Sequence, residues 1–297
     1  MNKNAKIYYN NPAIRAGVAV FIWAAMAVIV VGLHRIPTLE MLSFSLLIAF
    51  ACTCTDLTIR KKWSKLSISP LMLLVGSFAV AGTSALYIYS FKLAPPVHVE
   101  LIMYVWPVLV LLGNVLFFGE KFSIKILASI LLSIIALFIL HLDNQQWSYG
   151  FSYNVGYMTV FTAAITWTCY NLYTKHKCNI THEMMGIYCG VGAVFIVTLH
   201  FLFEPTIMPN KTEIILLLSM GFFSQWFAYQ AWDYAVKNAA PATLANLAYA
   251  TPILSVIMLT ISGYANFNIF LLMSCLLIII STFILMPKHS GNIRGNQ

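Results

Sequence analysis

The amino-acid sequence predicts an all-α integral membrane protein of ten transmembrane helices, arranged as a five-plus-five inverted-topology repeat with both termini in the cytoplasm. Composition gives the first reason. Of the 297 residues, 60% are hydrophobic and 9% are charged, whereas about 25% are charged in soluble domains. A soluble chain of this length cannot bury so much apolar surface, so we expect the apolar segments to lie in a lipid bilayer.

An internal repeat gives the second reason. Residues 91–120 align with residues 236–265, an offset of 145 positions. The identical pairs are Lys92 with Lys237, Ala94 with Ala239, Pro96 with Pro241, Tyr104 with Tyr249, and Pro107 with Pro252. Each segment therefore reads as a membrane span that a proline interrupts. Such segments at corresponding positions of two halves indicate a transporter binding site.

Ten apolar stretches have about the twenty residues that a membrane span requires. They are residues 13–33, 38–56, 70–90, 94–118, 123–142, 153–173, 183–203, 213–235, 241–262 and 267–286. The connections between them are too short to hold a soluble domain. The first stretch is too long for the apolar part of a signal peptide and is followed by no convincing cleavage site, so we expect it to be a span.

Individual spans carry features that assign them roles. The first and sixth spans have a tryptophan at nearly the same offset, Trp23 and Trp167. The third span contains small residues, such as Ser77 and Ser84, which allow helices to approach closely. The fourth and ninth spans contain the matched prolines. The fifth and tenth spans are the most uniformly apolar, and we expect them to lie outside any binding site.

Lysine and arginine predict the orientation, because these residues favour cytoplasmic loops. With the N-terminus inside, all of the 17 Lys and Arg residues except Arg35, Lys92 and Lys211 lie on the cytoplasmic side. Ten spans then divide into two repeats, at residues 1–145 and 146–297. Because five is odd, the second repeat enters the membrane from the opposite side.

Glu100 is the carboxylate that these boundaries place well inside a span. It shares a helical face with Tyr104 and Pro107 at i, i+4 and i+7 spacing. An ionisable residue in a membrane normally faces the protein interior or a watery cavity. Glu100 is therefore a candidate to bind a substrate amino group or to couple transport to protons. The alternative is a structural glutamate in the first turn of a helix, where the dipole favours an anion.

Three further residues are candidates for moving parts. His98 is a second coupling candidate, although it lies about 200° around the helix from Glu100; its alternative is an ordinary capping or solvent contact at the outer interface. Pro107 and Pro252 each remove a backbone hydrogen bond. We interpret them as hinges that let half-helices rock, with static kinks as the alternative.

Aromatic and amide side chains recur at helical spacing on several spans. Rings can stack on an aromatic substrate or accept a cation over their faces, whereas ordinary helix packing explains any one of them equally well. With Glu100, the candidate substrate-binding residues are Trp23, Tyr87, Tyr104, Trp106, Trp167, Tyr170, Asn171, Gln225, Tyr229, Asn246 and Tyr249.

Several classes of function are excluded. The basic residues lie in short loops between spans, so the net charge of +8 does not indicate nucleic-acid binding. The spans contain no deep lysine or arginine, which argues against a phosphorylated substrate. His182 and Glu183 begin an HExxH-like motif that lacks its second histidine, and the six cysteines form no CxxC motif. No Walker A sequence is present. We expect no cofactor, no metal and no catalysis.

Four patches resemble one known family. They are Tyr104-Val105-Trp106-Pro107, Ile165-Thr166-Trp167-Thr168-Cys169-Tyr170, Ala228-Tyr229-Gln230-Ala231-Trp232 and Thr251-Pro252-Ile253-Leu254-Ser255. Together with ten spans and a proline in the fourth and ninth, they resemble the drug/metabolite transporter superfamily of the EamA type, and within it the YddG-type aromatic amino acid exporters. The architecture covers the whole chain, whereas the subfamily signal rests on the patches.

The resemblance implies a bacterial inner-membrane exporter of amino acids, with aromatic ones favoured, that works by alternating access. Its partners would be this small substrate and membrane lipid, with no obligate protein partner. The alternative within transport is efflux or uptake of organic cations, drugs or other metabolites. An intramembrane enzyme or a non-catalytic receptor subunit is the alternative from another class. Proton coupling and facilitated diffusion both remain compatible with the sequence.

Overall fold

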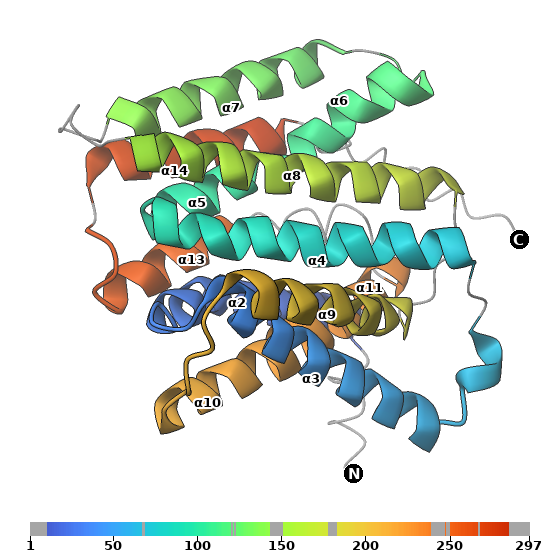
Figure 1. Ribbon diagram of the computed structural model, residues 1–297. Helices are drawn as coiled ribbons and strands as arrows, with labels where there is room; N and C mark the ends of the chain where they lie inside the picture. Colours follow the sequence, from blue (N-terminus) through green and yellow to red (C-terminus); the bar gives the residue numbers. More distant parts are fainter. Residues whose placement is uncertain are drawn as a thin grey trace, which may run out of the picture.

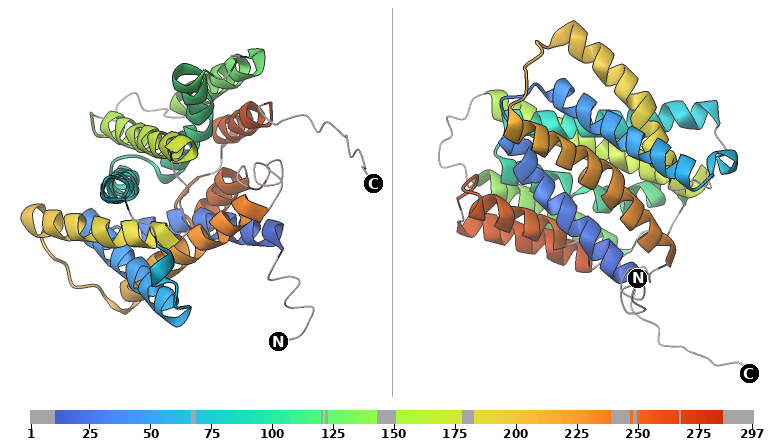
Figure 2. Two further views of the ribbon diagram at one scale, coloured as in Figure 1. Left: turned by 90° about the vertical axis from the view of Figure 1, so that its right-hand side faces the viewer. Right: turned by 90° about the horizontal axis from the view of Figure 1, so that it is seen from below.

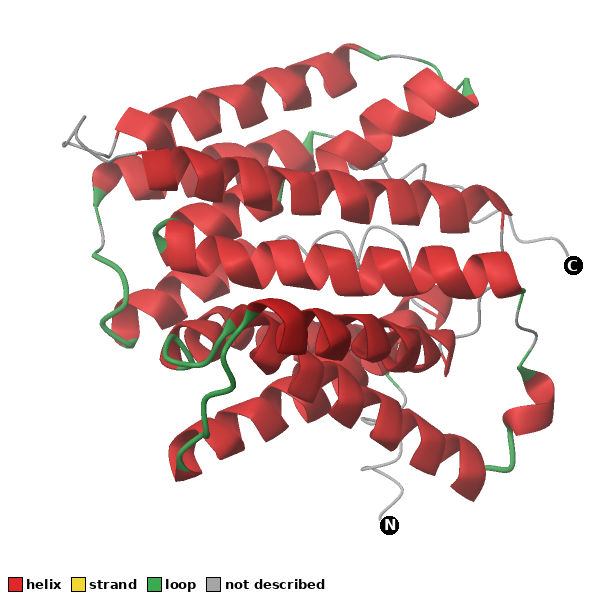
Figure 3. Cartoon of the chain, in the orientation of Figure 1, coloured by secondary structure: helices red, strands yellow, loops and turns green. Residues whose placement is uncertain are grey.

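The computed structural model describes residues 11–66, 69–119, 121, 123–142, 151–177, 183–238, 247, 250–266 and 268–284. Every regular element in these ranges is helical (Figure 3). The helices are α2 Pro12–Gly32, α3 Thr38–Ile59, η1 Trp63–Lys65, α4 Pro70–Leu93, α5 Pro96–Met103, α6 Trp106–Phe118, α7 Ile124–Leu142, α8 Phe151–Lys177, α9 Glu183–Phe203, α10 Lys211–Ser219, η2 Met220–Ala228, α11 Tyr229–Asn238, α13 Ala250–Ile261 and α14 Ile269–Phe283.

Local sequence explains where several helices begin. Asn11 caps α2, because its side chain accepts a hydrogen bond from the backbone N–H of Ala13, and Pro12 occupies the first helical position. Pro70 and Pro96 begin α4 and α5 in the same way. Asn210 and Glu213 form a reciprocal capping box at the start of α10.

Six helical stretches are long and apolar enough to cross a membrane: Pro12–Gly32, Thr38–Ile59, Pro70–Leu93, Pro96–Phe118, Glu183–Phe203 and Lys211–Trp232. Three shorter apolar helices accompany them, at Ile124–Ala136, Ala250–Ile261 and Ile269–Ser281. The chain is therefore an all-helical membrane protein with about ten helical segments. This part of the fold prediction is confirmed.

Four helices extend beyond the predicted spans, namely α3, α4, α8 and α11. These helices continue three or four residues past the predicted ends at 56, 90, 173 and 235. Hydropathy marks only the residues that suit lipid, whereas the backbone stays helical into the polar ends. Span eight is also composite: it begins as α10, becomes the π-helical stretch η2, and ends as α11.

The helices of the first five spans and those of the second five make equivalent packing contacts. Helix α3 packs on α9 and α7 packs on α14, which pairs spans two with seven and five with ten (Figure 2). Helix α4 packs on α8, and α2 correspondingly packs on η2 and α11. Helix α13 packs on α2, as α5 and α6 pack on α8. Exchanging the two halves therefore leaves these main pairings unchanged.

The fourth span is broken within the bundle. Helix α5 ends at Met103 and α6 begins at Trp106, with Pro107 in its first turn. Tyr104 N–H still bonds to the carbonyl of Glu100, but Val105 N–H bonds to Ile102 in a tighter turn. The proline ring cannot continue the α-helical hydrogen bonds. The kink predicted at Pro107 is thus present as a break in the helix at Tyr104 and Val105. The break lies one turn after Glu100, and Pro107 lies two turns after it.

The connections lie alternately at the two ends of the helices. Those between α4 and α5, α9 and α10, and α13 and α14 share one end, whereas those between α3 and α4 and between α6 and α7 share the other (Figure 1). We call the first end the outer end, following the orientation that the lysine and arginine distribution predicts.

Candidate functional site

Glu100 lies at the junction of four helices. Its side chain is 1% exposed, and its carboxyl oxygen accepts a hydrogen bond from the hydroxyl of Tyr87 on α4. The side chain of Ser255, on α13, also interacts with this carboxyl group. Ser255 in addition donates to the carbonyl oxygen of Ala24 on α2, at 3.2 Å. Residues from both halves of the chain therefore converge on one buried carboxyl group.

Tyr104 lies one helical turn after Glu100 and interacts with it electrostatically. The phenol hydrogen bonds to the side chain of Thr251 on α13. Tyr229, the first residue of α11, interacts electrostatically with both Tyr87 and Tyr104. Two phenols, Tyr87 and Tyr104, thus lie close to the carboxyl group, and Tyr229 lies near both of them.

A chain of aromatic rings extends from Tyr229. The ring of Trp23 meets it edge-on, with 5.4 Å between the centroids, and the ring of Trp232 lies 5.5 Å from that of Trp23. On the other side, the ring of Trp167 lies 6.3 Å from Tyr229 and stacks on Tyr170 at 5.4 Å. These separations are typical of favourable aromatic pairs. The helices α2, α8 and α11 are joined through these rings.

We call this group the aromatic–carboxyl cluster. Its members are Trp23, Tyr87, Glu100, Tyr104, Trp167, Tyr170, Tyr229, Trp232, Thr251 and Ser255. They combine flat apolar faces with hydroxyl groups and a single carboxyl group, which suits a ligand that has a ring and an amine.

The aromatic–carboxyl cluster contains one acidic side chain and no basic one. Within the described ranges, Glu100 forms no ion pair with a lysine, arginine or histidine. An ionised carboxylate buried without a cation is strongly unfavourable, whereas pairing with a cation offsets that cost. The cluster is therefore able to attract a proton or a cationic group. In the same part of the chain, no group of three His, Cys, Asp or Glu residues is placed to hold a metal ion.

A family comparison identifies the chain. The model of the EamA-like transporter family matches residues 13–142 and again residues 154–286. The chain belongs to the EamA-like transporter family. Two matches in tandem indicate a duplicated repeat, in agreement with the repeated helix packing. The family is one of transporters and not of enzymes, so the prediction that the chain is not an enzyme is confirmed.

Curated relatives within this family are aromatic amino acid exporters. This EamA-like chain is 28% identical over 195 residues to the aromatic amino acid exporter YddG of Ancylobacter novellus, covering 65% of this chain and 68% of that protein. It is 25% identical over 176 residues to YddG of Escherichia coli, covering 54% of this chain and 56% of that protein. The homology confirms the resemblance inferred from the four sequence patches.

A solved crystal structure shares the fold of this EamA-like chain. The TM-score is 0.73 at 22% sequence identity, and the match covers 92% of this chain and 96% of the other. The agreement extends over both halves. At this identity it shows the common architecture alone.

Three predicted site residues of the EamA-like chain are not members of the aromatic–carboxyl cluster. The amide of Asn171 donates to the carbonyl oxygen of Trp167, one turn earlier, at 2.6 Å. Trp106 begins α6, and its carbonyl oxygen accepts from Thr168 at 3.3 Å. Gln225 is 3% exposed in η2, one turn from Tyr229, and its side-chain oxygen has no hydrogen-bond partner in the structure.

His98 faces away from the aromatic–carboxyl cluster. It is 4% exposed, and its Nδ1 atom lies 2.6 Å from the hydroxyl of Tyr157 on α8. The helical spacing predicted that His98 and Glu100 point in different directions, and they do contact different helices. The histidine is buried, however, rather than in contact with solvent at an interface.

Two predicted site residues, Asn246 and Tyr249, lie outside the described residues. The second proline, Pro252, is buried in α13, the described part of which begins at Ala250.

Thr251, Ser255 and Trp232 were not among the predicted site residues. Thr251 and Ser255 lie one turn apart on α13, among apolar neighbours. Two isolated hydroxyl groups on one face of an apolar helix are a usable signal, because such groups need buried partners. Trp232 follows Tyr229 at helical i, i+3 spacing and belongs to the same stripe as Gln225.

Proposed function

We propose that this chain exports amino acids, aromatic ones favoured, across the bacterial inner membrane by alternating access. The aromatic–carboxyl cluster is the observation on which this rests. The rings of Trp23, Trp167 and Tyr229 offer faces and edges to an aromatic side chain. Glu100 would bind the ammonium group of the substrate. The names of the curated relatives support the same substrate class.

The proposed architecture is a pair of five-helix repeats, residues 1–145 and 146–297, of opposite topology and with cytoplasmic termini. The two family matches and the exchange symmetry of the helix packing support the duplication. The distribution of lysine and arginine supports the orientation. Inverted repeats usually place the substrate site between the halves, and the cluster draws residues from both.

Glu100 also gives a proposed route to proton coupling. A buried carboxyl group without a protein cation loses its charge either by taking a proton or by pairing with a bound ammonium group. These two events exclude each other at one group. A substrate that enters from the cytoplasm would therefore displace a proton, and a proton from the outside would displace the substrate. Without such competition, the same site would support facilitated diffusion.

Transport into proteoliposomes tests the proposal. Purified protein would be reconstituted, and uptake of labelled tryptophan, phenylalanine, glutamate and choline measured with and without a pH gradient. We expect saturable flux of the two aromatic amino acids and little flux of glutamate. Stimulation by the gradient would support proton coupling. Flux of choline without flux of any amino acid would contradict the proposed substrate class.

One observation favours a second candidate, the transport of organic cations. The cluster contains a carboxyl group but, within the described residues, no positively charged side chain to balance a substrate carboxylate. A cationic aromatic amine would neutralise Glu100 completely. Competition by tryptamine, tryptophan amide and indole propionate against labelled tryptophan separates the candidates. An amino acid exporter is inhibited most by tryptophan itself, whereas a cation transporter is inhibited most by tryptamine and not by tryptophan.

A further inference from the structure

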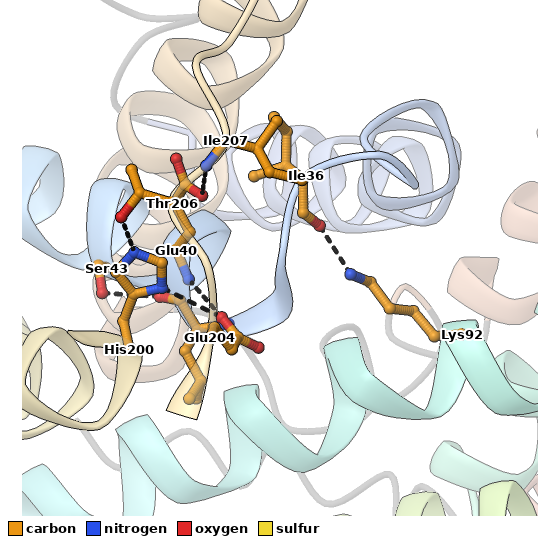
Figure 4. Close-up of polar contacts among 9 residues, drawn as sticks. Ile36, Glu40, Ser43, Lys92, His200, Glu204, Thr206 and Ile207 are labelled. Atoms are coloured by element: carbon orange, nitrogen blue, oxygen red, sulfur yellow. Dashed lines mark hydrogen bonds and ion pairs between the residues drawn. The ribbon is translucent and has the colours of Figure 1, made fainter. Parts of the chain in front are cut away.

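Two connections from different halves of the chain are bound to each other at the outer end (Figure 4). Glu204 directly follows α9, and its Oε2 atom accepts hydrogen bonds from the backbone N–H groups of Leu39 and Glu40, at 2.9 and 3.2 Å. These donors belong to the first turn of α3, where free N–H groups and the helix dipole favour an anion. His200 Nδ1 lies 3.2 Å from the same oxygen.

The binding is reciprocal. Glu40 Oε2 accepts a hydrogen bond from the backbone N–H of Ile207 at 2.9 Å. Arg35 donates to both carboxylate oxygens of Glu213, at 2.8 and 2.5 Å, and to the carbonyl oxygen of Met208 at 2.9 Å. Bonding to Glu213 raises the pKa of the Arg35 guanidinium. We call these contacts between residues 35–40 and residues 204–213 the outer clasp.

The clasp continues a tightly packed seam between α3 and α9. A side-chain carbon added at Gly186 would overlap Thr53, and one added at Gly190 would overlap the ring of Phe50. Such close packing leaves no room for these helices to slide. Lys62 and Glu183 close the other end of the same seam, with 2.9 Å between the charged atoms. Helices α3 and α9 therefore form one unit with the clasp.

Helix α4 is held to the outer clasp differently. Lys92, its penultimate residue, donates a hydrogen bond to the carbonyl oxygen of Ile36 at 2.7 Å (Figure 4). The lysine is exposed, and its ammonium also interacts electrostatically with Glu204 and Glu40. The Oε1 atom of Glu40 is buried and has no hydrogen-bond partner in the structure. Farther from this end α4 packs closely on α9, because a side-chain carbon added at Gly192 would overlap Ala81. At the outer end, the hydrogen bond from α4 to the clasp comes from the one long, flexible side chain of Lys92.

We propose that Lys92 is a releasable latch that holds the outer gate closed. Helix α4 leads directly into α5, and these two helices carry Tyr87 and Glu100. Release of Lys92 from Ile36 lets the outer ends of α4 and α5 move away from the clasp, which exposes the aromatic–carboxyl cluster to the outside. Glu40 and Glu204 keep the ammonium close, so that the latch re-forms. This gate serves whichever substrate the cluster binds.

Crosslinking tests whether the contact must open. A double variant, His34→Cys with Lys92→Cys, would be joined by a bifunctional methanethiosulfonate reagent, which forms reducible disulfides. His34 is exposed and lies two residues before Ile36, whose own side chain is fully buried. Lys62→Cys with Glu183→Cys, across the packed seam, is the matched control. We expect crosslinking to abolish flux in the first pair, with recovery on reduction, and to leave the second pair active. Single-cysteine variants control for reaction at native cysteines. Normal flux from the fully crosslinked first pair overturns the proposal.

Hydrogen exchange tests the latch without any substrate. In nanodiscs, Lys92→Met should raise amide exchange about fivefold across residues 86–103, in line with the loss of one hydrogen bond. Exchange at Leu39 and Glu40 should not change, because the clasp stays formed. Lys92→Arg should resemble the native protein, and Lys211→Met controls for removal of an exposed outer lysine. Unchanged exchange at 86–103 in Lys92→Met, or an equal rise in Lys211→Met, overturns the proposal.

Discussion

The hydroxyl of Tyr87 donates a hydrogen bond to the buried carboxyl group of Glu100, and so joins α4 to α5 at the centre of the aromatic–carboxyl cluster. The same carboxyl group meets Ser255 of the second repeat. A ligand that binds Glu100 therefore changes contacts of both halves at once. Differential contacts of this kind are what allow a ligand to shift a conformational equilibrium.

Glu100→Gln should reduce tryptophan flux at least about thirtyfold, since losing one partner of a buried charge pair costs about 2 kcal/mol or more. The amide keeps the shape and can still accept from Tyr87, but it carries no charge. Stimulation by a pH gradient should disappear as well. Uptake into proteoliposomes at several pH values measures both effects. Asp56→Asn, which breaks the partly exposed pair with Arg60 at the end of α3, is the control. Native flux in Glu100→Gln at all pH values would remove Glu100 from the mechanism.

Trp167→Ala should raise the KM for tryptophan about tenfold, as expected when an aromatic residue at a binding site is truncated. Its ring stacks on Tyr170 and approaches Tyr229, so the substitution removes the ring that lies between these two tyrosines. Trp63→Ala, in η1 and 46% exposed, should leave the KM unchanged. Concentration-dependent uptake separates KM from maximal flux. Equal effects of the two substitutions would indicate general destabilisation instead of a binding role.

Most of the fold could be predicted from the sequence because long apolar segments have few alternatives in lipid. The ends of α3 and α8 were predicted too early, since polar residues such as Thr58 and Lys177 remain helical beyond the apolar stretch. The π-helical stretch η2 has no sequence signal of comparable strength. It depends on how α2 and α3 pack against Met220–Ala228.

The cluster could be predicted in part. Periodicity placed Trp167 with Tyr170, and Glu100 with Tyr104, on common helical faces. It could not predict that Ser255 reaches Glu100, because that contact joins segments 155 residues apart and depends on the angle at which α13 crosses α5. The contact between Tyr87 and Glu100 depends in the same way on tertiary structure, because the short connection between α4 and α5 sets how these two helices face each other.

The inverted repeat predicts a counterpart of the outer latch at the opposite end of the helix bundle. Lys237, on α11, aligns with Lys92, in the last turn of α4. Lys237→Met should therefore raise amide exchange across α11 about as much as Lys92→Met raises it across the end of α4. The two substitutions should act on different ends of the protein. Increased exchange at residues 86–93 in Lys237→Met would contradict this symmetry.

Pro107→Ala should slow transport about tenfold with little change in KM. The alanine N–H is able to bond to the carbonyl of Met103, which favours one continuous helix in place of α5 and α6. Opening of a gate often limits the rate of a conformational cycle, and a straight helix resists it. Pro70→Ala, at the first position of α4 where proline is harmless, is the control. Unchanged maximal flux in Pro107→Ala would show that the break is a static kink.

Gly186→Ala should destabilise the protein by about 1–3 kcal/mol, the usual cost of overpacking. The new methyl group would overlap the side chain of Thr53 on α3, where the helices are in close contact. Gly82→Ala is the matched control, because nothing lies within 4 Å of the added carbon, and alanine favours the helix. Thermal unfolding in detergent measures both. Thr53→Gly, which removes the overlapping Cβ as well as the hydroxyl and methyl groups, should partly rescue Gly186→Ala relative to the effect of Thr53→Gly alone, which a non-specific loss of stability would not allow. Failure of this rescue, or equal melting temperatures for Gly186→Ala and Gly82→Ala, would contradict the view that α3 and α9 form one rigid unit beneath the outer clasp.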